Sequence, residues 1–232
     1  HRDLHSFPTR RSSDLPGILL LLEHFRMEMA FQGKTVAQAC EASQISPKVF
    51  LKVANLFNGY SPSFLTGLEN GEILQVIAFL KNAHAYYRTE KYPEIRGLIE
   101  EMIQRNPSEV VKLTGDFFEE YYQEVNEHLD YEDQVAFPYF HSLTTGSPPA
   151  REEGSLPFSA AQYREHHTDI ETKLTDLKNL LLLHIPIGND LAIRRKLLVS
   201  LFEFEYDMHI HSRIEEEVLI PEIERIEKRN SR

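Results

Sequence analysis

The sequence of 232 residues predicts an all-α protein, an up-down four-helix bundle at residues 70–228 preceded by a small N-terminal helical domain at 16–66. Three observations support this prediction. Apolar residues recur every three to four positions over long stretches, no stretch alternates as a half-buried strand would, and Gly and Pro cluster between the long stretches. Residues 1–15 lack a starting Met and an apolar run, so we expect them to be a non-native leader.

The N-terminal domain is expected to contain three short helices. The first covers about residues 17–31, and two more lie within 35–58 on either side of Ser46-Pro47. This pair has the spacing of a helix-turn-helix, but also that of a plain helical hairpin. Because the net charge is −11, we favour a docking module over DNA binding.

Four long helices follow. The first begins at Asn70, a good N-cap, and is expected to break at Pro93. The second begins at Asn106-Pro107, with Glu109 closing a capping box, and fades near 138–141. The third runs from a cap at Ser159 to about 186, and the fourth covers about 189–228.

The informative feature is an internal repeat. His128 begins HLDYEDQVAFP and His211 begins HSRIEEEVLIP, so both copies hold His, Glu at +4, Val at +7 and Pro at +10. The offset of 83 residues also carries His84 onto His167. The chain therefore repeats one unit, a helix with a His followed 44 residues later by a His-x3-Glu.

These polar residues fall where the helical pattern calls for apolar ones. The six candidates are His84, His128, Glu132, His167, His211 and Glu215. Their apolar neighbours at 3–4 spacing include Leu80, Val125, Val135, Leu174 and Met208. Tyr87, Tyr121 and Tyr163 share these positions, where packing is the simpler role.

Buried carboxylates and imidazoles must be compensated. Hydrogen bonds in a polar core layer are one solution. A metal pair is a better one, because cations offset the carboxylate charges and use the imidazole lone pairs. A set of N and O ligands without sulfur favours two irons over manganese, and a single structural zinc would not use six ligands. His166, beside His167, is an alternative ligand.

The pattern H…HxxxE…H…HxxxE over residues 70–227 resembles the hemerythrin-like (HHE) domain, in particular the repair-of-iron-centres (iron-sulfur cluster repair di-iron) proteins. The resemblance implies that the six residues ligate two Fe ions in an oxo- or hydroxo-bridged di-iron centre. It implies a role in repairing iron-sulfur centres or in the response to nitrosative or oxidative stress. An O2- or NO-binding sensor or carrier, and an oxidase- or peroxidase-type enzyme, are the alternatives.

The N-terminal domain departs from that family. Family members often carry a Cys pair there, whereas this chain has only Cys40, so thiol-dependent iron transfer is not expected. The lone Cys also excludes an internal disulfide and fits a cytoplasmic location. The run 18–22 is too short to span a bilayer. Expected partners are O2 or NO, damaged iron-sulfur proteins and a second copy in a homodimer, with nucleic acid and membranes disfavoured.

Overall fold

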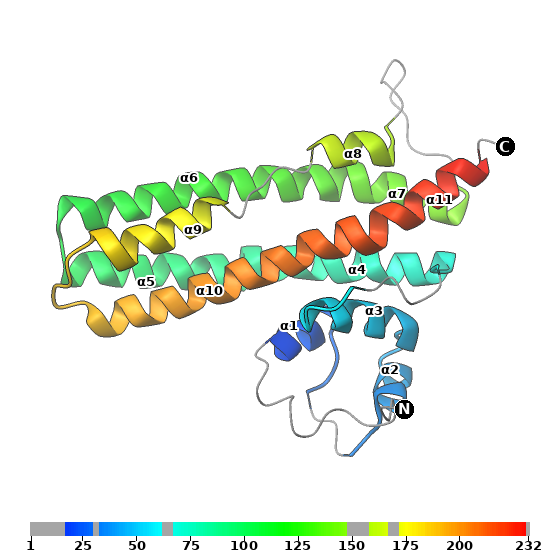
Figure 1. The fold of residues 1–232 in the computed structure, drawn as a ribbon, viewed down its shortest axis with the longest axis horizontal. Coiled ribbons are helices and arrows are strands. Elements are labelled where there is room, and N and C mark those ends of the chain that lie inside the picture. Colours follow the sequence, from blue (N-terminus) through cyan, green and yellow to red (C-terminus); the bar gives the residue numbers. More distant parts are fainter. Residues whose placement is uncertain (1–16, 30–32, 62–66, 148–157, 167–171, 231–232) are drawn as a thin grey trace. The chain divides into compact units, whose positions relative to one another are not determined.

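The computed structural model describes residues 17–29, 33–61, 67–147, 158–166 and 172–230, which contain helices and turns and no strand (Figure 1). The prediction of an all-α protein is therefore confirmed, while the up-down four-helix arrangement stays a prediction. No helix among these residues is long and apolar enough to cross a membrane. The expected leader at 1–15 lies outside the described residues.

The chain divides into two compact units, the first drawn from 1–83, 135–167 and 210–232 and the second from 84–134 and 168–209. The elements in chain order are α1 (Gly17–His24), α2 (Val36–Ala42), α3 (Pro47–Phe57), α4 (Asn70–Tyr86), η3 (Tyr87–Lys91), α5 (Tyr92–Arg105), α6 (Glu109–Tyr131), η4 (Glu132–Ala136), α7 (Phe137–Thr145), α8 (Ala160–His166), α9 (Thr172–Asn179), η5 (Leu180–His184), α10 (Leu191–Ile214), η6 (Glu215–Leu219) and α11 (Ile220–Asn230). The η segments are π-helical, so their backbone hydrogen bonds reach one residue further than in an α-helix.

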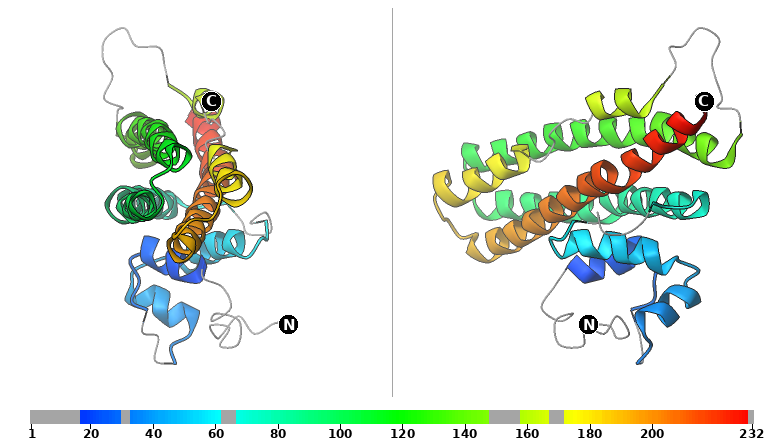
Figure 2. Two further views of the ribbon diagram at one scale, coloured as in Figure 1. Left: turned by 90° about the vertical axis from the view of Figure 1, so that its left-hand side faces the viewer. Right: turned by 45° about the vertical axis from the view of Figure 1, so that its right-hand side comes forward.

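In the first unit, α3 contacts both α1 and α2, and α11 contacts α7 and α8 (Figure 2). The N-terminal helices begin as the sequence predicts, because Thr35 forms a capping box with Gln38 and Pro47 opens α3. The helix expected at 17–31 is shorter, since α1 ends at His24. The ring of Phe79 on α4 lies 4.6 Å from that of Phe25, which directly follows α1, and 6.5 Å from that of Phe57 at the end of α3, so these apolar side chains pack on α4.

In the second unit, α6 contacts α5 and α9 (Figure 1). The rings of Tyr92 and Tyr122 stack at 3.6 Å between α5 and α6. Lys91 is 3% exposed, and its ammonium group lies 3.2 Å from the Glu203 carboxylate of α10. Aromatic packing and a partly buried ion pair thus join helices of this unit that are distant in sequence.

Each π-helical segment is followed by one residue and then a proline. These prolines are Pro93, Pro138, Pro186 and Pro221. Proline has no N–H, and in an α-helix its ring clashes with the carbonyl four residues earlier. We infer that the wider turn accommodates the proline. The helix expected to break at Pro93 instead continues to Arg105, so that prediction was wrong.

The wider turn also changes which side chains face inward. Val135, expected in the core, is 40% exposed, whereas its neighbours Ala136 and Phe137 are buried. One extra residue in the η4 turn rotates the later positions by about 100° around the axis, which the 3–4 pattern does not anticipate. In the repeated segment Val218 stays buried, at 2% exposed.

Two helix starts test the capping predictions. The second long helix begins at Glu109 rather than at Pro107, and its N-cap is Ser108, whose hydroxyl accepts from the Val111 N–H. Asn106 instead caps the C-terminus of α5. The cap at Ser159 is confirmed, because its hydroxyl accepts from the Gln162 N–H at 3.3 Å.

Arg194, which is 5% exposed, forms hydrogen bonds with the segment between η5 and α10. Its guanidinium donates to the carbonyls of Leu181, Ile185 and Pro186 and to Asp190 at 2.6–3.0 Å. Replacing Arg194 by Ala leaves these acceptors without their donor. We therefore expect the free energy of unfolding at pH 7 to fall by about 3 kcal/mol in a urea titration.

The control is Arg195→Ala, because Arg195 is the exposed neighbour and its replacement should change stability by less than about 0.5 kcal/mol.

Burial alone would raise the pKa of Asp190, but hydrogen bonds from Arg194 and Gly188 outweigh it and hold that pKa below its usual 3.8. The Arg194–Asp190 pair therefore stabilises the fold fully at pH values above the usual pKa of the Asp190 carboxyl group. This stabilisation is lost as the pH falls through the lowered pKa of the folded protein. Equal stabilities of Arg194→Ala and wild type at pH 7 would contradict this account.

Candidate metal centre

The candidate ligands sit where the helices pass from α to π geometry. His84 lies in the last turn of α4, and His128 in the last turn of α6, four residues before Glu132 opens η4. His211 and Glu215 occupy the matching positions of α10 and η6, 83 residues later. The repeat found in the sequence is therefore also a repeat of local backbone structure.

Glu132 lies between two imidazoles. Its Oε1 is 3.0 Å from His128 Nε2, and its Oε2 is 3.1 Å from His84 Nε2. Glu132 is fully buried, and the side chains of His84 and His128 are 1% and 10% exposed. The two oxygens of this carboxylate thus face histidines from two different helices.

The second copy of the motif is equally buried. His211 Nε2 lies 3.3 Å from Glu215 Oε1, with side chains 3% and 0% exposed. The spacing of four residues places both groups on one face of the helix, as the sequence predicts.

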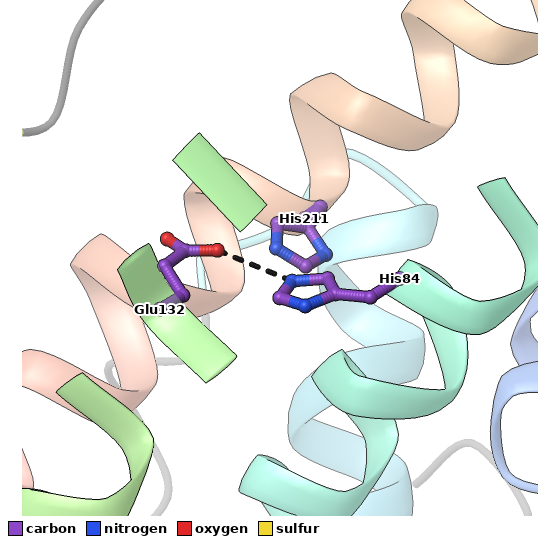
Figure 3. A group of neighbouring side chains, drawn as sticks. All are labelled: His84, Glu132 and His211. Carbon is purple, nitrogen blue, oxygen red and sulfur yellow. Dashed lines mark ion pairs between the residues drawn. The ribbon is translucent and has the colours of Figure 1, made fainter. Parts of the chain in front are cut away.

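Two groups of three side chains could hold a metal ion. His84, Glu132 and His211 form one, and His128, Glu132 and Glu215 form the other, with ligand atoms within 4.8 Å of one another in each group. Figure 3 shows the His211 ring beside the His84 ring, and the Glu132 carboxylate directed toward His84. Glu132 belongs to both groups, and together the two groups contain five of the six predicted ligands.

The imidazole of His84 lies between two carboxylates. His84 faces a carboxylate at both ring nitrogens, because its Nδ1 lies 3.1 Å from Asp133 Oδ1 while its Nε2 faces Glu132. A neutral imidazole has one N–H, so it can donate to only one of them. A cation at Nε2 would accept the remaining lone pair and offset the Glu132 charge.

The N–O separations also suit metal ligation. Ligands about 2.1 Å from a metal and at right angles to each other lie about 3 Å apart. The three imidazole–glutamate separations of 3.0, 3.1 and 3.3 Å are close to that value. The donor atoms of both groups are nitrogen and oxygen.

Asp133 and Arg88 were not predicted from the sequence. Burial raises the pKa of Asp133, but its hydrogen bonds with His84 and Arg88 and the charge of Arg88 outweigh burial and lower that pKa below its ordinary value. The sequence could have indicated both residues, because Arg88 follows the candidate ligand His84 by four residues and Asp133 directly follows the candidate ligand Glu132.

His167 lies outside the described residues, so its assignment as a ligand, in preference to His166, stays a prediction. Tyr87, Tyr121 and Tyr163 are each at most 1% exposed, which agrees with the packing role expected of them.

No family model, no curated protein and no solved structure matches the chain. The interpretation of the site therefore rests on its own residues and their geometry.

Cys40 is fully buried, and burial raises the pKa of its thiol to about 11. Since the thiolate is the reactive form, we expect a thiol reagent such as DTNB at pH 8 to label the folded protein at least about 100-fold more slowly than the urea-unfolded chain. Labelling should accelerate as the pH approaches 11. Because Cys40 is the only cysteine, Cys40→Ala serves as the blank. Rapid labelling of the folded protein would contradict the buried position.

Proposed function

We propose that this protein binds a non-haem di-iron centre and acts in the repair of iron-sulfur centres or in the response to nitrosative or oxidative stress. The observation that carries the proposal is the buried Glu132 carboxylate, which faces His84 through one oxygen and His128 through the other. Within this proposal a metal-binding or repair role is preferred to that of a turnover enzyme.

The chain's own residues suit such a centre. Glu132 and Glu215 would supply two negative charges, and the imidazoles would supply neutral nitrogen donors. Iron is proposed because carboxylate-rich N/O sites suit it and because the motif resembles the repair-of-iron-centres proteins. The bound metal would supply redox chemistry and a place for a small molecule such as O2 or NO. The burial of the ligand side chains would limit the access of water to it.

Metal analysis tests the centre directly. Full-length protein loaded anaerobically with ferrous iron should hold about two irons per chain and, after exposure to air, absorb in the near-ultraviolet and visible range. Glu132→Gln keeps the shape of the side chain but removes its charge, so we expect it to lose at least half of the iron. Glu120→Ala, an exposed carboxylate on α6, should retain the wild-type content. A folded wild-type protein that holds no metal in excess iron would remove the proposal.

A repair assay then separates the functions. The iron-loaded protein should restore activity to a [4Fe–4S] dehydratase inactivated by NO, and Glu132→Gln should not. Tight iron binding without restoration would reject the repair role. If such a protein instead binds NO reversibly, the O2/NO sensor or carrier takes its place.

A further inference from the structure

A chain of polar contacts leads outward from His84. Its Nδ1 lies 3.1 Å from Asp133 Oδ1, and the other Asp133 oxygen accepts from Arg88 Nη1 at 2.8 Å. The exposed fraction of the side chain rises along this series of contacts, from 1% at His84 to 20% at Asp133 and 30% at Arg88. The contacts therefore connect a buried candidate ligand to the surface.

Arg88 is itself held in place by α6. Its Nη2 donates to Asp130 Oδ1 at 2.8 Å, and its Nε donates to Asn126 Oδ1 at 3.2 Å. The three acceptors, Asn126, Asp130 and Asp133, follow one another at helical spacing on α6 and η4. A guanidinium that donates in three directions has one orientation, which fixes the Asp133 carboxylate that it contacts.

A cation bound at Nε2 of His84 would leave the imidazole proton on Nδ1, which faces Asp133. Only one nitrogen of a neutral imidazole is an acceptor or a metal ligand. If Nδ1–H donates to Asp133, the lone pair is on Nε2, the atom that faces Glu132. Carboxylates behind metal-binding histidines act in this way, and their loss typically lowers metal affinity by about 10- to 100-fold.

The second copy of the repeat lacks the same set of residues. At an offset of 83, Arg88 corresponds to Glu171, Asp130 to Arg213 and Asp133 to Glu216. The guanidinium of Arg213 contacts Glu217 at 2.7 Å within its own helix. By sequence, an arginine on the His-bearing helix is present in the first copy and replaced by a glutamate in the second.

We propose that Asp133, oriented by Arg88, is a positioning residue that sets the tautomer and rotamer of His84, and that this makes the two metal positions unequal. The inference rests on the proposed metal centre. It adds that one metal equivalent depends on Asp133 and Arg88 while the other does not.

The test measures both metal equivalents separately. Metal-free full-length protein is titrated with Co²⁺, whose visible bands report binding, in competition with a chelator. In wild type we expect two equivalents. In Asp133→Ala and Arg88→Ala we expect one of them to weaken about 10- to 100-fold and the other to change little. Arg88→Lys should lie between Arg88→Ala and wild type, because lysine keeps the charge but not the three-way geometry.

The matched control is Arg96→Ala, since Arg96 also joins two helices by contacting Glu119, 3.3 Å away on α6. It should leave both equivalents unchanged. Urea unfolding of the metal-free variants separates positioning from folding, because a purely structural role lowers stability without changing the ratio of the two affinities. Wild-type affinities in both Asp133→Ala and Arg88→Ala, or an equal loss of both equivalents, would overturn the inference. If wild type binds no Co²⁺, the proposed centre itself fails.

Discussion

The burial of two carboxylates among histidines is the constraint on which the rest of the structure depends. Glu132 and Glu215 are fully buried, and an unpaired charge in such a place is strongly unfavourable. Neutral imidazoles can donate hydrogen bonds to these groups but cannot offset their charge. A bound cation would offset the charge and use the imidazole lone pairs, and two groups of these side chains could hold one.

The backbone around the carboxylates follows from the same motif. Glu132 and Glu215 each open a π-helical segment, and a proline follows six residues later. Up to the glutamate the helix keeps α geometry, so the His and Glu side chains share one face. Beyond it the wider turn lets the helix continue through the proline and resets which residues point inward. The proline at +10 is therefore part of the local structure that ends the ligand-bearing turn, and not only a helix terminator.

Much of this was accessible from the sequence, because helical spacing and a fixed repeat offset are one-dimensional signals. They predicted the helices, the cap at Ser159 and the burial of His84 and Glu132. They failed where the outcome depends on packing. Pro93 was expected to break a helix, since proline rules describe an isolated helix and not one held by its neighbours. Asp133 and Arg88 lie off the apolar stripe and meet only after folding brings positions 45 residues apart together.

The repeat keeps the candidate ligands but not the residues that contact them. Residues that could touch a metal recur at an offset of 83, because ligand geometry allows few substitutes. Arg88, which lies one contact further out, does not recur in the sequence, where Glu171 stands at the offset of 83, because nothing in the geometry of ligation requires the two positions to match. If the duplicated motif holds two ions as proposed, similar ligands would contact both, while the surroundings would adjust each one separately. Since those surroundings influence affinity and redox potential, any difference in behaviour between the two ions would have to arise there and not in the shared ligand motif.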